Sequence, residues 1–215
     1  MNFKAAIFDL DGTLIDSMWV WEKVDKEFVA RRNLNIPENY AEEVAGLSFE
    51  QTAQYTIEKL GLSDSVQDLV AEWNDMGKYE YANNVKLKAQ AKEYILKLKS
   101  LGVKLSTATS LSPVLSEIVL KSNGIYDLFD EQCHAYEVNK GKSEPDIFLL
   151  AAEKLGVSPE HCIVFEDILP GVASAKKAGM KVFCMHDEYS KHNMTKIQTI
   201  ADGYLYDFSN APLPN

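Results

Sequence analysis

The sequence has few of the features expected of a secreted, disulfide-stabilised or membrane-spanning protein. Its three cysteines, Cys133, Cys162 and Cys184, show no C-x-x-C spacing, and two of them lie in apolar, strand-like runs. Buried, reduced thiols are therefore expected, which suits a reducing cytosol. No apolar region follows the positive charge at the N-terminus, and no window of about 18 apolar residues could cross a membrane. The expected location is cytoplasmic, without a membrane partner.

Positive charge is also scarce, because 22 Lys and Arg residues face 32 Asp and Glu residues, a formal net charge of −10. This balance argues against binding to nucleic acid and to anionic membrane surfaces. It disfavours an anionic substrate as well, unless a divalent metal and a well-placed lysine make the site locally positive. The four histidines show no metal-ligand spacing, and the sequence has no internal repeat and no low-complexity tract.

Strand-like and helix-like segments alternate from about residue 85 onward. Apolar runs at 103–108, 162–165 and 181–185 predict strands, and a short run at 204–205 predicts a last edge strand. Helical patterns fill the intervals between them, several opened by proline or ended by glycine. With the apolar run at 4–8 added, this alternation predicts an α/β fold, in which helices cover both faces of a parallel sheet.

The stretch from residue 17 to 84 has a different pattern, because it is helical and has few strand-like runs. Val20, Val24 and Phe28 recur at helical spacing, and further helices are predicted over 49–60 and from 66 to about 81. We therefore expect residues 1–16 and 85–215 to form an α/β core domain, and residues 17–84 to form an inserted helical domain.

Two carboxylates stand where the first predicted strand ends. Asp9 and Asp11 follow the apolar run directly, and Gly12 permits a tight turn at no steric cost. Open parallel sheets place their active sites at the carboxyl ends of strands. There one carboxylate can attack, the other can move protons, and both can help to hold a hard cation. The alternative is an Asx turn that merely closes the strand.

Other predicted strand ends carry polar residues that suit the same chemistry. Thr109 and Ser110 follow the strand at 103–108, and Glu166 and Asp167 follow the strand at 162–165. The two acids could simply favour the N-terminus of the next helix. With Asp9 and Asp11 at the same edge, however, a magnesium site is favoured, because Mg²⁺ binds one or two carboxylates together with water and substrate oxygens.

The stretch Ile7–Ser17 resembles the first motif of the haloacid dehalogenase superfamily of phosphotransferases. Later segments extend the resemblance along nearly the whole chain, and the subgroup that it resembles most is the small phosphatases similar to beta-phosphoglucomutase. The resemblance implies a Rossmann-like, three-layer core. It also implies that residues 17–84 are a helical cap, which closes over the site and selects the leaving group.

The same resemblance assigns catalytic and metal-binding roles to the acids. Asp9 would be the nucleophile that forms an aspartyl-phosphate, and Asp11 would be the general acid and base. Mg²⁺ would be held by Asp9, by the backbone carbonyl of Asp11 and by Asp167. Glu166 matches the acid that precedes the metal-binding aspartate, and its contact could be direct or through water.

Phosphate-binding roles follow in the same way. The segment that begins at Gly141 resembles the third motif, in which a lysine neutralises the nucleophile and the phosphoryl oxygens, here Lys142. On its own, a lysine after glycine is usually a solvated surface charge. Thr109 matches the hydroxyl residue of the second motif and is preferred to Thr107, which alternation places on the same side. Ser110 would add its backbone amide.

The expected function is therefore a magnesium-dependent phosphatase that acts on a small phosphorylated metabolite, as a monomer or weak dimer. One alternative is a phosphomutase, although an arginine that grips the second phosphate in beta-phosphoglucomutases is replaced here by Phe49. Another is a signalling module that holds a phosphorylated Asp without turnover. Trp19 and Trp21 could line the roof of the pocket or belong to the small core of the cap.

Overall fold

A parallel sheet organises the fold. The computed structural model describes residues 1–37 and 39–215, and in this part of the chain six strands pair in the order β5-β4-β1-β6-β7-β8. The strands are β1 (Ala5–Phe8), β4 (Lys104–Thr109), β5 (Glu131–His134), β6 (Cys162–Glu166), β7 (Lys181–Met185) and β8 (Gly203–Leu205). All five pairings between them are parallel. The predicted α/β fold is confirmed, and the predicted last strand lies at an edge.

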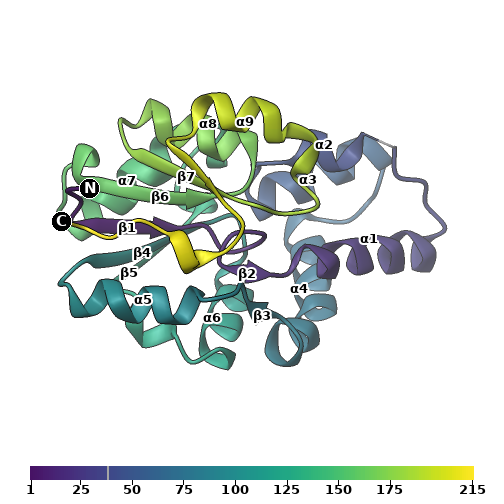
Figure 1. Ribbon diagram of the computed structural model, residues 1–215. Helices are drawn as coiled ribbons and strands as arrows, with labels where there is room; N and C mark the ends of the chain where they lie inside the picture. Colours follow the sequence, from purple (N-terminus) through teal and green to yellow (C-terminus); the bar gives the residue numbers. More distant parts are fainter. Residues whose placement is uncertain (38) are drawn as a thin grey trace.

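Helices cover both faces of this sheet (Figure 1). They are α5 (Ala91–Ser100), α6 (Pro113–Ser122), α7 (Asp146–Leu155), α8 (Leu169–Lys177) and α9 (Met194–Ile200). Successive residues of a strand face opposite sides of a sheet. Accordingly, Ala5 and Ile7 of β1 belong to the core beneath α7 and α8, whereas Ala6 and Phe8 belong to the core that includes α5 and α6. All four residues of β1 are buried.

Four further helices lie to one side of the sheet, at the right of Figure 1. They are α1 (Met18–Arg32), α2 (Tyr40–Val44), α3 (Phe49–Leu60) and α4 (Val66–Asn83). The chain leaves the sheet through β2 (Ile15–Asp16) and returns through β3 (Lys86–Leu87), and these two short strands pair antiparallel. The two ends of the helical segment therefore lie next to each other, at the β2–β3 pair.

Local sequence features explain the limits of α3. Ser48 caps its first turn, because the Ser48 hydroxyl accepts from the backbone of Gln51 while the Gln51 side chain accepts from the backbone of Ser48. At the other end Gly61 has a φ of 66°, in the left-handed region that glycine adopts without strain. The predicted bounds of this helix are those observed.

The connections contain short 3-10 helices: η1 (Tyr126–Leu128), η2 (Ala135–Glu137), η3 (Gly141–Ser143), η4 (Pro159–His161), η5 (Lys191–Asn193) and η6 (Phe208–Asn210). All three cysteines are buried and unpaired, as predicted. Among the helices of the described residues, none combines the length and apolarity needed to span a bilayer.

Candidate active site

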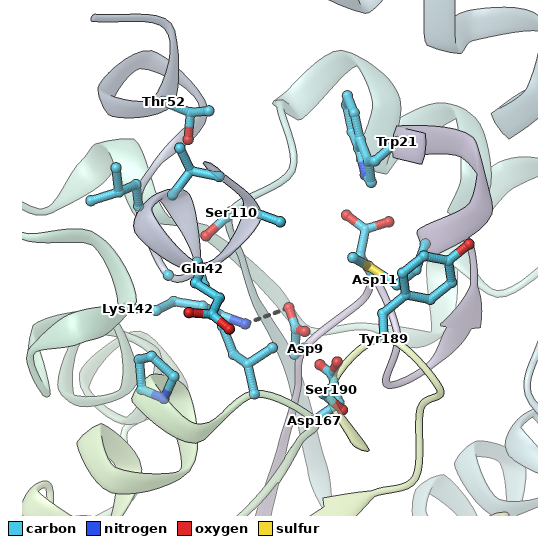
Figure 2. Close-up of a pocket in the computed structure, with 18 of the residues that line it drawn as sticks. Asp9, Asp11, Trp21, Glu42, Thr52, Ser110, Lys142, Asp167, Tyr189 and Ser190 are labelled. Carbon is cyan, nitrogen blue, oxygen red and sulfur yellow. Dashed lines mark ion pairs between the residues drawn. The ribbon is translucent and has the colours of Figure 1, made fainter. Parts of the chain in front are cut away.

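Three neighbouring strands place polar side chains at the same edge of the sheet. Asp9 follows β1, Thr109 is the last residue of β4, and Glu166 is the last residue of β6. Because β1 pairs in parallel with both β4 and β6, the carboxyl ends of these three strands lie side by side. The predicted convergence of these segments is therefore observed. Figure 2 shows Asp9 at this edge, together with Asp167 and Ser110 from the turns after β6 and β4.

Lys142 is the central cation of the site. It lies in η3, and its side chain is 2% exposed. Its Nζ lies 2.5 Å from Asp9 Oδ1 (Figure 2) and 2.6 Å from Glu166 Oε1. Burial opposes the protonated form, but the two carboxylates outweigh this effect and raise the pKa of Lys142 above its ordinary value. Lys142 is therefore a permanently charged, buried group and not a solvated surface lysine.

The position of Lys142 is fixed through the backbone of the helical segment. The Lys142 amide donates to the carbonyl oxygen of Gly46 at 2.8 Å, in the loop before α3. Gly141 has a φ of 57°, and a side chain there would lie 2.7 Å from that same carbonyl oxygen. This close approach between η3 and the loop requires glycine.

Glu166 is held by donors on both of its oxygens. Oε1 accepts from Lys142, and Oε2 accepts from the backbone amides of Asp167 at 2.6 Å and Ile168 at 2.9 Å. The side chain has no exposed surface. It thereby orients Lys142 toward Asp9 and fixes the start of the turn that carries Asp167.

Asp9, Glu166 and Asp167 form a buried acidic cluster, with one oxygen of each within 4.8 Å of the others. Burial raises the pKa of Asp9 to about 7 although Lys142 acts in the opposite direction. Burial, followed by the charge of Glu166, raises the pKa of Asp167 well above its ordinary value. The Thr13 hydroxyl donates to Asp167 Oδ1 at 3.0 Å. Three carboxylates thus share one buried cation, an imbalance that favours binding of a further cation.

Asp11 lies beside this cluster and has different partners. Its Oδ1 accepts from the Ser17 hydroxyl and from the Tyr81 hydroxyl, the latter at 2.5 Å. Burial raises the pKa of Asp11, while these two donors oppose the rise. Tyr81, a buried residue of α4, was missed by sequence reasoning, because its distance of 70 positions from Asp11 gives no local pattern.

Thr109 and Ser110 both line the cavity above the acids, whereas Thr107 does not. The Thr109 hydroxyl accepts from the Leu111 amide at 3.0 Å and so shapes the turn after β4. The Ser110 hydroxyl is buried and has no hydrogen-bond partner among the described residues. Thr109 and Ser110 thus share the cavity lining with Lys142, an arrangement that suits an oxyanion ligand.

The cavity has a volume of about 750 Å³ and extends from the acids at the sheet edge to the helical segment. Trp21, Phe49 and Trp73 line it from α1, α3 and α4, and Tyr189 and Ser190 line it from the segment after β7. Figure 2 shows the Trp21 side chain next to Asp11. Trp19 is absent from the described lining, and its indole nitrogen donates to the Asp16 carbonyl. The predicted roof role therefore suits Trp21 and not Trp19.

Residues 6–185 match the model of the haloacid dehalogenase-like hydrolase family. The chain belongs to this family. The resemblance inferred from the first motif is thus confirmed, over most of the chain.

Relatives in the haloacid dehalogenase-like family include named phosphatases. Hexitol phosphatase A of Escherichia coli is 30% identical over 190 residues, which cover 86% of this chain and 84% of that protein. A phosphorylated carbohydrates phosphatase of Thermotoga maritima is 28% identical, over 83% of this chain and 82% of that protein. These names agree with the predicted phosphomonoester hydrolase.

Solved structures of the family share the fold. The crystal structure of CbbY from Rhodobacter sphaeroides in complex with phosphate matches with a TM-score of 0.86 at 23% identity, over 97% of this chain and 96% of that chain. A beta-phosphoglucomutase from Clostridium difficile matches with a TM-score of 0.81 at 21% identity, over 98% of this chain and 94% of that chain.

Proposed function

We propose that the protein is a magnesium-dependent phosphatase, which hydrolyses a small phosphate monoester through an aspartyl-phosphate intermediate. The observation that carries this proposal is the Asp9 carboxylate at the floor of a cavity, paired with buried Lys142 and adjoining Asp167. A carboxylate in this position can attack phosphorus, and the lysine can stabilise the charge that develops on the transferred group.

In the proposed reaction, the Asp9 carboxylate attacks phosphorus and the bond to the leaving oxygen breaks. Asp11 donates a proton to that oxygen, and in the second half it accepts a proton from the attacking water. The raised pKa of Asp11 supports the first of these roles, because it favours a protonated carboxyl group. Lys142, Thr109 and Ser110 would bind the phosphoryl oxygens.

The acidic cluster suits Mg²⁺ by charge and by ligand type. Asp9, Asp167 and the Asp11 backbone carbonyl would hold the ion, since Mg²⁺ prefers a few protein oxygens together with water. The two oxygens of Glu166 already accept from Lys142 and from backbone amides. Glu166 would therefore orient the residues that bind the ion, or contact the ion through water. Bound Mg²⁺ would supply neutralising charge to the phosphoryl oxygens and orient them.

Residues 17–84 would serve as the cap over the core formed by residues 1–16 and 85–215, in a cytoplasmic enzyme. The cavity supports this division, because its lining comes from the strand ends on one side and from α1, α3 and α4 on the other. Movement of the helical segment about the β2–β3 pair would admit the substrate and then exclude water.

The direct test is release of inorganic phosphate from a panel of phosphorylated metabolites with Mg²⁺, repeated with a chelator. We expect turnover that chelation abolishes and that Asp9→Asn lowers by at least about 1000-fold, because the nucleophile is lost. Asp16→Asn is the matched control, since Asp16 is exposed, lies nearby in the chain and is absent from the described cavity lining. Full activity of Asp9→Asn would remove Asp9 from the mechanism.

The same experiment separates the alternatives. A phosphomutase would form glucose 6-phosphate from the 1-phosphate with little phosphate release. A signalling module would retain a stable acyl-phosphate, detectable by mass spectrometry, without turnover. Either result would overturn the proposed hydrolase.

A further inference from the structure

The wall of the cavity contributed by the helical segment contains a cluster of aromatic rings. The rings of Trp21 and Phe49 are 5.3 Å apart between centroids, and those of Phe49 and Trp73 are 5.6 Å apart. All three residues line the cavity. Such a surface suits the carbon skeleton of a leaving group, but by itself it does not select among esters.

Asp25 of α1 differs from the other acidic residues of this wall in its lack of partners. It lines the cavity, and within the described residues its carboxylate has neither a hydrogen bond nor an ion pair. Burial raises the pKa of Asp25 to about 6. Glu22, on the same helix and in the same lining, is by contrast paired with Lys26 and Tyr189. Asp25 is therefore a hydrogen-bond acceptor without a donor among residues 1–37 and 39–215.

Trp73 of α4 lines the same cavity and is 4% exposed. Its indole Nε1–H has neither accessible surface nor an acceptor among the described residues. Trp73 therefore offers the cavity an apolar ring and not a hydrogen-bond donor, which leaves Asp25 as the unmatched polar group of this wall.

We propose that Asp25 recognises hydroxyl groups on the leaving group of the substrate. A hydroxyl can donate to the Asp25 carboxylate, while the aromatic rings contact the carbon skeleton. A leaving group that carries a carboxylate or a second phosphate at this place meets the like charge of Asp25. Asp25 therefore selects uncharged, hydroxylated monoesters over alkyl esters and over bisphosphates. This inference rests on the proposed function.

The test compares two six-carbon esters, glucitol 6-phosphate and n-hexyl phosphate, which differ in their hydroxyl groups. Wild-type kcat/KM should favour the glucitol ester. Asp25→Leu should lower kcat/KM for that ester by about 10- to 100-fold, since hydrogen bonds to a charged group are lost, and change the hexyl ester by less than about threefold.

Glu27→Gln is the control, because it removes one negative charge from the same helix at a residue outside the described lining of the cavity. It should leave kcat/KM for both esters unchanged. Equal losses for the two esters in Asp25→Leu, or no loss for either, would overturn the recognition role.

A binding measurement keeps this test independent of turnover. The dissociation constants of both esters are measured by calorimetry in an Asp9→Asn background, with and without Asp25→Leu. A preference for the glucitol ester that Asp25→Leu removes supports the assignment, and a preference that survives contradicts it. Absence of phosphate release from every ester would instead refute the proposed hydrolase, and the ratio of dissociation constants would still decide the role of Asp25.

Discussion

A single residue, Tyr81, affects the orientation and the pKa of Asp11 through one hydrogen bond. Its hydroxyl lies 2.5 Å from Asp11 Oδ1 and favours the ionised carboxylate. Removing it in Tyr81→Phe should therefore raise the pKa of Asp11, so that the acid stays protonated to higher pH. We expect kcat to fall about 10- to 100-fold through lost orientation, and the alkaline limb of the kcat–pH profile to move to higher pH.

Steady-state kinetics from pH 5 to 9 measure both effects. Tyr79→Phe is the matched control, since Tyr79 lies on the same helix and is 68% exposed, and it should change neither. If Tyr81→Phe lowered kcat without moving the pH profile, Tyr81 would have a packing role only.

Residues in the local motifs could be predicted, and residues brought from elsewhere by packing could not. Asp9 and Asp11 stand in one turn after a strand, so their proximity follows from the chain itself. Tyr81 and Asp25 enter the site because α4 and α1 lie over the sheet edge, and helical periodicity does not say which neighbour a helix will contact. The catalytic and metal-binding roles of the predicted residues stay predictions.

The first turn of helix α8 packs against the buried Glu166 carboxylate, and this contact leaves no space for a side chain at Gly171. A Cβ at Gly171 would collide with the Glu166 side chain, which Lys142 and two backbone amides hold in place. Gly171→Ala should lower the free energy of unfolding by about 1–3 kcal/mol, the usual cost of overpacking, although alanine favours helices. Urea unfolding measures the change.

Gly77 of α4 is the control, because a Cβ there lies 3.4 Å from Leu115, an ordinary contact. Gly77→Ala should be neutral or stabilising by up to about 1 kcal/mol, since alanine is the better helix former. Equal effects of the two substitutions would show that the Glu166 side chain moves aside.

Elements with strong patterns could be predicted, and weakly patterned ones could not. The strand Lys181–Met185 and the helix Phe49–Leu60 have their predicted bounds. The strand Glu131–His134 was missed, because Glu131 and Gln132 are polar and only half-buried at the sheet edge. The pairing of Ile15 with Leu87 was also missed, since two-residue strands carry no periodicity.

At the scale of the whole molecule, Asp25 lines the cavity between the sheet edge and the helical segment, and its carboxylate has no ion pair among the described residues. The negative charge of Asp25 acts on the Tyr40 phenol, whose pKa is raised to about 12, chiefly by burial, so the phenol stays neutral near pH 7. His192 and Lys196 also line the cavity. A carboxylate kept there to bind substrate hydroxyl groups lowers the free energy of unfolding of the protein without substrate.

The sign of that cost follows from the two pKa values. Burial raises the pKa of Asp25 to about 6 in the folded protein, against about 3.9 in the unfolded chain. The folded state therefore binds the proton more tightly, and stability falls as pH rises from about 4 to 6. Asp25→Asn removes this loss, so its free energy of unfolding should match wild type near pH 4 and exceed it by about 1–3 kcal/mol at pH 8. Urea unfolding at the two pH values measures the difference, with Glu27→Gln as the control for loss of one charge. A variant that is less stable than wild type at pH 8 would mean that Asp25 is already satisfied in the free protein, and the recognition role would lose its physical basis.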